Sequence, residues 1–265
     1  LPESRLPDSV FVSYDMSQIL PGSEAILIVV PSDKVEATLE KAAPFIQQQS
    51  LIICSKGFAA EARLLSEVVQ QKHKGQLYCL YGPTHAEEVG GGMFSGIVLA
   101  GGKGKTKLKN AIESPVLRVD TSNDIIGVQV AAALKNILAV GVGILDGAGM
   151  GDNAKAYMIT KGLQEITKVG IAMGGKKETF YGLAGIGDIL VTCGSKHSRN
   201  FHVGQEVGKG RPLQEVLAEM KMVAEGVTTI QFVPQLEKKY SLEIPLLRGV
   251  YDILYSGKKI VDVLK

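Results

Sequence analysis

The chain has 265 residues, of which 45% are hydrophobic, and a formal net charge of +2. A chain of this length can bury a substantial core as one large domain or two ordinary ones. Positive and negative residues are nearly balanced and form no long block of one sign, which argues against a dedicated nucleic-acid surface. Tryptophan is absent and aromatic residues make up 6%, so a platform that stacks bases is not expected either.

The cysteines also limit the possible functions. There are three, Cys54, Cys79 and Cys193, and no two of them have the C-x-x-C spacing. This odd number favours neither a disulfide framework nor a zinc site, and the four histidines show no metal-binding spacing. We therefore expect no bound metal and a reducing, cytoplasmic location.

Up to about residue 122 the sequence alternates apolar runs with helical stretches. Runs rich in branched residues are typical of strands buried on both faces, and strands that alternate with helices favour a doubly wound parallel sheet. We therefore expect a Rossmann-like α/β domain over residues 1–122. Its strands are predicted at 25–31, 51–55, 77–82, 95–100 and 115–119, with helices from about 33, at 60–71 and between the last two strands.

No strand is predicted after residue 122, so residues 123–265 should form a second, all-helical domain. The GAGMG segment at 147–151 resembles a glycine-rich phosphate loop, but it follows a helix instead of a strand. We interpret it as a tight turn between two helices. Helices are predicted around 125–145 and at 152–173, 213–220, 226–237 and 245–255.

The first domain is expected to be incomplete at its N-terminus. The sequence opens with LPESRLPDS, without a methionine, and has no G-x-G-x-x-G between a predicted strand and a predicted helix. That fingerprint holds the pyrophosphate of a dinucleotide. If the chain uses a dinucleotide, we expect the first strand and the phosphate loop to lie upstream of Leu1.

Lys135 lies in the middle of an apolar stretch, residues 125–145, in which only Gln129 and Asn136 are also strongly polar. A buried ammonium group must be paired, because its burial costs several kcal/mol. Asp188 lies in a second apolar stretch and is the natural partner, so we predict that Lys135 is functional. Two alternatives are a membrane-spanning helix and a core helix whose lysine reaches the surface.

Polar residues also follow the predicted strands, where open parallel sheets bind their ligands. Ser32 follows the first strand, Lys56 follows the second, and Gly82 and Thr84 follow the third. Further along, SKHSRN at 195–200 contains Arg199, which could hold a phosphate through two parallel hydrogen bonds. The simpler alternatives are a solvated strand end for Lys56 and an exposed polar turn for SKHSRN.

Several longer strings together resemble the bacterial type of NAD(P)-dependent glycerol-3-phosphate dehydrogenase. They are SKGF, YGPTHAEEV, ALKNILAVGVGILDGAGMGDNAKAYMITKGL, TFYGLAGIGDILVTC, SRN and VAEGVTT. The resemblance implies reversible reduction of dihydroxyacetone phosphate to sn-glycerol 3-phosphate for phospholipid synthesis, with NAD or NADP as cofactor and NADPH somewhat favoured. We also expect a homodimer without a membrane span.

The same resemblance implies roles for individual residues. Lys135 corresponds to the general acid/base, with Lys56 and Asp188 as its catalytic neighbours. The substrate site would comprise Lys56, Gly82, Thr84, Lys135, Asn136, Asp188, Ser198, Arg199 and Asn200, and the cofactor contacts would be Lys56, Ala86, Arg199, Val223 and Glu225. The alternatives are another β-hydroxyacid or keto-acid reductase, and a non-catalytic binding or assembly module that kept the fold.

Overall fold

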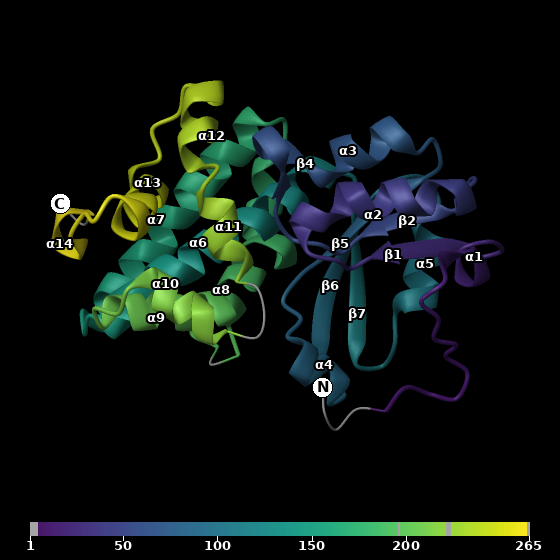
Figure 1. Ribbon diagram of the computed structural model, residues 1–265, viewed down its shortest axis with the longest axis horizontal. Helices are drawn as coiled ribbons and strands as arrows, with labels where there is room; N and C mark the ends of the chain where they lie inside the picture. Colours follow the sequence, from purple (N-terminus) through teal and green to yellow (C-terminus); the bar gives the residue numbers. More distant parts are fainter. Residues whose placement is uncertain (1–4, 196, 221–223, 264–265) are drawn as a thin grey trace.

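The computed structural model describes residues 5–195, 197–220 and 224–263. The first half is built on a five-stranded sheet with the order β1-β2-β5-β6-β7 (Figure 1). Its strands are β1 (Ala25–Ile28), β2 (Ser50–Ile53), β5 (Leu77–Tyr81), β6 (Ser95–Gly101) and β7 (Leu117–Ser122). The helix α1 (Met16–Ile19) precedes the sheet. The connections contain η1 (Ser32–Lys34), α2 (Val35–Ala42), η2 (Ala43–Phe45), β3 (Phe58–Ala59), η3 (Ala60–Ala62), β4 (Arg63–Leu64), α3 (Leu65–Lys72), α4 (Ala86–Gly90) and α5 (Lys105–Ile112).

Helices cover both faces of this sheet. Along β2, Leu51 and Ile53 pack in the cluster that contains α2 and α3, whereas Ile52 packs in the cluster that contains α5. This alternation follows from the period of two in a strand. The predicted Rossmann-like α/β architecture is therefore confirmed.

The sheet is mixed, however, and not parallel throughout as predicted. β1, β2 and β5 are parallel to one another, as are β6 and β7, but β5 and β6 pair antiparallel. A parallel connection must travel back along the strand, usually as a helix. The segment between β5 and β6 contains only the five-residue helix α4, which is too short to do so.

Two predicted helices also differ. Residues 58–64 form the small β3–β4 hairpin before α3, because Glu61 and Ala62 have positive φ values of 60° and 53°. The helix predicted at 226–237 is split into α11 (Glu225–Ile230) and α12 (Val233–Tyr240). Pro234 lies in the first turn of α12, where its ring prevents continuation of the preceding helix.

Among the described residues after Ser122, every regular element is helical. The division at residue 122 stays our proposal for the domain boundary, and the predicted turn at GAGMG lies between α6 and α7. The elements not yet named are α6 (Ile125–Gly147), α7 (Gly151–Ala172), η4 (Lys177–Tyr181), η5 (Leu183–Gly187), α8 (Asp188–Gly194), α9 (Arg199–Gly208), α10 (Leu213–Glu219), α13 (Pro245–Tyr255) and α14 (Ile260–Val263).

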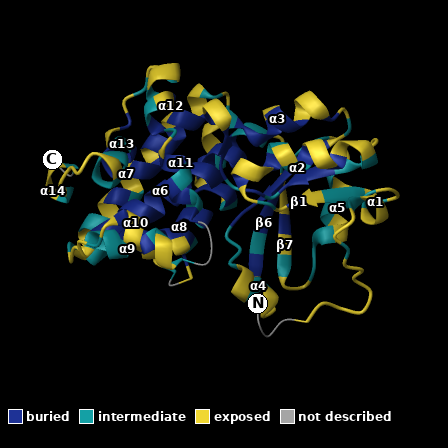
Figure 2. Cartoon of the chain, viewed as in Figure 1, coloured by how far each residue is buried: buried dark blue, intermediate teal, exposed yellow. Residues whose placement is uncertain are grey.

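α6 is the central helix of this half. Its length and hydropathy would suit a membrane span, but 89% of its most apolar 18-residue window is buried inside the protein, as its dark blue colour in Figure 2 shows. Its polar Gln129 is satisfied internally: Nε2 donates to Ser66 Oγ at 2.8 Å, and Oε1 accepts from Ser66 N at 3.0 Å. α6 therefore has the surroundings of a core helix.

α6 and α9 approach each other through glycines. A Cβ atom on Gly143 of α6 would lie 2.2 Å from the carbonyl oxygen of Phe201 on α9. A Cβ atom on Gly204 of α9 would lie 2.0 Å from the carbonyl oxygen of Val140 on α6. Both distances are far shorter than van der Waals contact, so the two backbones touch directly.

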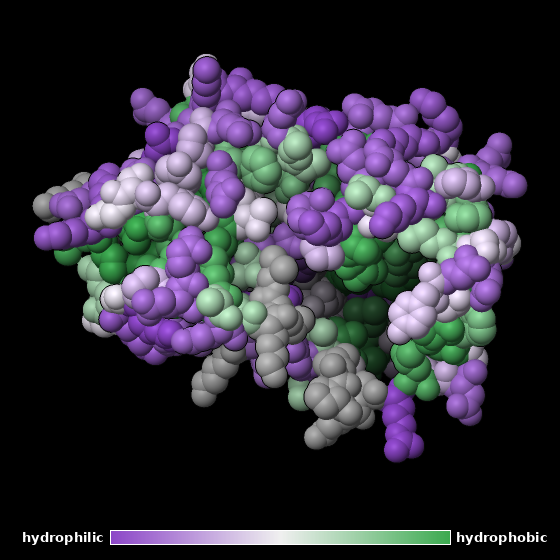
Figure 3. Space-filling model, viewed as in Figure 1, coloured by the Kyte–Doolittle hydropathy of each residue, from purple (hydrophilic) through white to green (hydrophobic). Residues whose placement is uncertain are grey.

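The sheet ends in an exposed apolar edge. β1 is an edge strand of the sheet. Its Leu27 is 51% exposed, and Val29, which follows the strand, is 68% exposed. In the space-filling view, hydrophilic side chains dominate the upper surface, and hydrophobic ones show in the hollow below β1 (Figure 3). That a dinucleotide fingerprint precedes Leu1 stays a prediction.

Candidate active site

Lys135 is buried at the middle of α6, and its side chain is 5% exposed. Its Nζ atom donates to Asp188 Oδ1 at 2.5 Å and to Thr192 Oγ1 at 2.7 Å. The predicted pairing with Asp188 is therefore confirmed, and the alternative in which the lysine reaches the surface is wrong.

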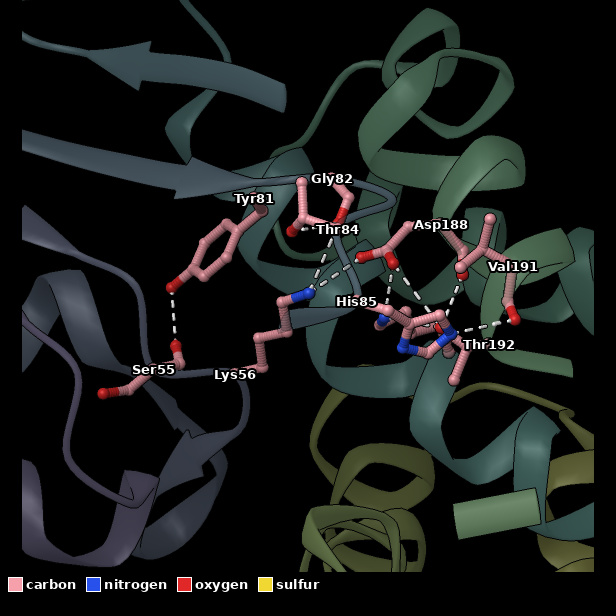
Figure 4. A network of polar contacts seen from close by, with 10 residues as sticks. Ser55, Lys56, Tyr81, Gly82, Thr84, His85, Asp188, Val191 and Thr192 are labelled. Atoms are coloured by element: carbon pink, nitrogen blue, oxygen red, sulfur yellow. Dashed lines mark hydrogen bonds and ion pairs between the residues drawn. The ribbon is translucent and has the colours of Figure 1, made fainter. Parts of the chain in front are cut away.

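Asp188 connects two lysines from opposite halves of the molecule, and Figure 4 shows its contact with Lys56. It begins α8, directly after the wide π-helical turn η5, and is 1% exposed. While Oδ1 accepts from Lys135, Oδ2 accepts from Lys56 Nζ at 3.2 Å. The two ammonium groups therefore share one buried carboxylate, which offsets part of the cost of burying them.

Lys56 reaches this carboxylate from the carboxyl edge of the sheet. Its side chain is 25% exposed, and Nζ also donates to the Gly82 carbonyl oxygen at 3.4 Å. Thr84 Oγ1 donates to the same oxygen at 3.2 Å. The residues predicted after the second and third strands thus meet the residues predicted on the central helix, and Lys56 is more than a solvated strand end.

The surroundings shift the acidity of Lys135 strongly. Its pKa is lowered to about 7, mainly by burial and also by the nearby Lys56 ammonium, against the opposing effect of the Asp188 carboxylate. Burial also raises the pKa of the neighbouring Cys193 thiol to about 12. Lys135 can therefore exchange a proton near neutral pH, while Cys193 stays a protonated thiol.

The residues of the SRN segment lie at the start of α9. Ser198 is 4% exposed, and its Oγ caps the helix by accepting from Phe201 N. Asn200 is 9% exposed, and its Oδ1 accepts from Gly226 N at 2.9 Å. Arg199 is exposed. Residues 198–200 are therefore a partly buried helix start, whereas His197 before them is exposed in a turn and residue 196 lies outside the described residues.

Asn136 and Asn200 both contact the start of α11. Asn136 is 5% exposed, and a Cβ atom on Gly226 would lie 2.6 Å from its carbonyl oxygen. Because Asn200 also bonds Gly226, the segment after Lys135 and the segment after Arg199 are tied together. These contacts bring the predicted substrate residues of α6 and α9 into one region.

The residues predicted on the cofactor side are more dispersed. Ala86 is exposed at the start of α4, and Glu225 is partly exposed at the start of α11. Val223 lies outside the described residues. Beside Ala86, an open groove between α4 and α8 is lined by His85, Glu88, Leu190, Val191, Gly194 and Ser195.

The structure also places Thr192 at the site, a residue that was not predicted from the sequence, and it gives Ser32 a partner that was not predicted. Thr192 accepts from Lys135 and donates to the Asp188 carbonyl oxygen at 2.6 Å. Its position four residues after Asp188 would have indicated the same helix face. Ser32 contacts Glu225 across 193 residues of sequence, and no local pattern signals that contact.

Comparisons with known proteins agree with this arrangement. A family model described as the NAD-dependent glycerol-3-phosphate dehydrogenase C-terminus matches residues 124–265, and its N-terminal counterpart matches residues 1–107. Glycerol-3-phosphate dehydrogenase (NAD(P)+) of Bacillus velezensis is 39% identical over 98% of this chain and 78% of its own length. The Prosthecochloris aestuarii protein of the same name is 39% identical over 100% of this chain and 82% of its own. This chain belongs to the NAD-dependent glycerol-3-phosphate dehydrogenase family.

Solved structures support the same family. The glycerol-3-phosphate dehydrogenase of Coxiella burnetii superposes with a TM-score of 0.95 at 32% identity, covering 99% of this chain and 82% of that one. A ketopantoate reductase of Ralstonia eutropha reaches a TM-score of 0.58 at 16% identity, and that likeness concerns the fold alone. The sequence resemblance to the dehydrogenase family is thus confirmed.

Proposed function

We propose that this protein catalyses the reversible NAD(P)H-dependent reduction of dihydroxyacetone phosphate to sn-glycerol 3-phosphate. The observation that carries the proposal is the buried Lys135–Asp188–Lys56 cluster between the sheet edge and the helical half. Membership of the dehydrogenase family supports the assignment of the substrate.

In this proposal Lys135 is the general acid/base. As an ammonium group it donates its proton to the oxygen that becomes the alcohol, and it takes a proton back in the reverse reaction. A pKa of about 7 allows both roles near neutral pH. Asp188 orients the lysine, and Lys56 and Asn136 stabilise negative charge on the substrate oxygen.

The start of α9 is the proposed phosphate site. Ser198 Oγ accepts the capping hydrogen bond and keeps its own hydrogen to donate. Asn200 accepts through Oδ1, so its amide nitrogen can donate. Together with Arg199 and the positive end of the helix dipole, these donors suit a phosphate. Gly82 and Thr84 complete the substrate side of the site next to Lys56.

The residues at the sheet edge also fit a nicotinamide cofactor, which would supply the hydride. Lys56 offers an ammonium group to its polar atoms, Glu225 offers a carboxylate with further lone pairs, and the exposed Ala86 leaves room beside the strand ends. Arg199 and Val223 are the remaining proposed contacts. We propose NADPH as the preferred form.

The wider setting follows from the same assignment. We propose that the protein works in the cytoplasm as a homodimer and that its product supplies phospholipid synthesis. The thiols support a reducing compartment: Cys54, Cys79 and Cys193 are all unpaired.

Oxidation of NADH and NADPH by the complete polypeptide, including any sequence upstream of Leu1, tests the proposal. The assay compares dihydroxyacetone phosphate with unphosphorylated dihydroxyacetone at equal concentrations. Fast oxidation with the phosphorylated ketone alone is expected, and the faster nucleotide identifies the cofactor. Equal rates with both ketones, or no oxidation with either, would overturn the assignment.

The pH dependence follows from the lowered pKa of Lys135. Reduction needs the ammonium form, so kcat/KM for the ketone should fall as the pH rises through about 7. Oxidation of sn-glycerol 3-phosphate needs the neutral amine, so its kcat/KM should fall as the pH drops through the same value. Initial rates in both directions across this range check the prediction. The prediction is wrong if kcat/KM for reduction and kcat/KM for oxidation do not change in opposite directions with pH.

A further inference from the structure

Ser32 and Glu225 join the two halves of the molecule beside the active site. Ser32 follows Pro31 at the carboxyl edge of the sheet and is 4% exposed. Glu225 Oε2 accepts from Ser32 Oγ at 2.8 Å, and Oε1 accepts from Ser32 N at 3.3 Å. One carboxylate of the helical half therefore binds two donors on the sheet edge. We call this pair the Ser32–Glu225 clasp.

The clasp lies directly against the residue that follows Lys56. A Cβ atom on Gly57 would lie 2.4 Å from Ser32 Oγ and 3.3 Å from Glu225 Oε2. The backbone at Gly57 therefore packs against both members of the clasp. A change in the position of Ser32 is transmitted to the backbone that carries Lys56, because close-packed groups cannot move independently.

The residue that follows Glu225 connects it to the helix that carries Lys135. The next residue, Gly226, bonds Asn200 and lies against the backbone of Asn136, which follows Lys135 on α6. The contacts thus form a closed ring that passes through both halves. In order, the ring comprises Lys135, Asn136, Gly226, Glu225, Ser32, Gly57, Lys56 and Asp188.

We propose that Ser32 is a positioning residue, which through its two hydrogen bonds to Glu225 holds the sheet edge against α11 and keeps Lys56 beside Asp188. Its effect on turnover rests on the proposed dehydrogenase function, whereas its effect on the geometry of the lysines does not. Ser32 need not touch the substrate in this role.

The proposal has an electrostatic consequence at Lys135. The charged groups that face Lys135 are Lys56 from the sheet edge and Asp188 from α8, and Thr192 and Cys193 nearby are neutral. Because the Lys56 ammonium lowers the pKa of Lys135, release of Lys56 from Asp188 should raise that pKa. A residue that only supports the fold would not move this property.

Ser32→Ala tests the proposal, because it removes the hydroxyl donor and leaves the backbone N–H. We expect kcat to fall about 10-fold, and the alkaline limb of ketone reduction to move upward by about half a pH unit or more. An NMR titration with isotope-labelled lysine should show the same upward shift for Lys135 without any turnover. That second readout separates failure of the clasp from failure of the assigned reaction.

Ser66→Ala is the matched control. Ser66 is also 4% exposed and also makes a two-point contact between the halves, with Gln129 of α6. The three atoms that lie nearest to a Cβ atom on Gly57 belong instead to Ser32 and Glu225. The Ser66→Ala variant should lose about as much folding stability as Ser32→Ala, and the pKa of Lys135 should stay unchanged in it. An unshifted titration in Ser32→Ala, or an equal shift in Ser66→Ala, would overturn the proposal.

A second pair of variants serves if Ser32→Ala does not fold. Glu225→Gln keeps both contacts, because its carbonyl oxygen can accept from Ser32 N and its amide can donate to Ser32 Oγ. Glu225→Ala removes both. If the proposal is correct, the pKa of Lys135 rises in Glu225→Ala and stays unchanged in Glu225→Gln. An equal pKa of Lys135 in the two variants would contradict the proposal.

Discussion

Replacement of Lys135 by methionine is expected to lower kcat for dihydroxyacetone phosphate reduction by about 10³-fold, with the fold retained. Methionine fills a similar volume in α6 but carries no proton to transfer. Asp188 keeps Lys56 as a partner at 3.2 Å, so the buried carboxylate is not left uncompensated. Steady-state rates, together with circular dichroism of the variant, measure the two parts of the prediction.

Lys155→Met provides the control for this variant. Lys155 also bonds two carboxylates in the helical half, those of Asp146 and Asp152, each at 2.8 Å, but it lies on α7 outside the site. Its replacement should leave turnover unchanged. Near-normal turnover in Lys135→Met would remove Lys135 from the mechanism and would assign the proton transfer to another group, such as Lys56.

The second large effect is expected for Arg199→Ala. Loss of a bidentate hydrogen bond to the phosphate should lower kcat/KM for dihydroxyacetone phosphate by about 10²-fold or more. The rate with unphosphorylated dihydroxyacetone should hardly change, so the preference for the phosphorylated ketone should shrink by the same factor. The measurement is the ratio of kcat/KM values for the two ketones.

Arg211→Ala is the matched control, because Arg211 lies beyond the other end of α9 and pairs with Glu206 and Glu219. It should keep the full preference for the phosphorylated ketone. An equal loss on both ketones in Arg199→Ala would show that Arg199 does not act through the phosphate. That result would favour a reductase for an unphosphorylated hydroxyacid.

The pairing of Lys135 with Asp188 could be predicted from sequence, because the free-energy cost of burying each charged group follows from the apolar residues next to it in the chain. An ammonium group inside an apolar helix and a carboxylate inside an apolar segment each need a partner of opposite charge. The position of Lys56 could be predicted because the carboxyl ends of parallel strands share one edge. The dehydrogenase family itself followed from long strings of sequence, not from these physical arguments.

Other features depend on contacts that leave no local pattern. The direction of β6 is set by the short connection through α4, and its apolar sequence would suit either direction. The helices α8 and α9 were not predicted as elements, since glycines and polar residues interrupt their apolar period. The contact between Ser32 and Glu225 arises only when the two halves come together.

The direct backbone contact between α6 and α9 has a consequence for substrate length. In the proposed mechanism Lys135 on α6 donates the proton and the start of α9 holds the phosphate, so the spacing of these two groups depends on the contact at Gly143 and Gly204 between the helices. No rotamer can adjust a spacing fixed by bare main chain. If these roles hold, the contact between the two helices limits the length of the substrate carbon chain. Engineering this protein toward longer ketone phosphates would have to begin at those two glycines, far from the atoms that react.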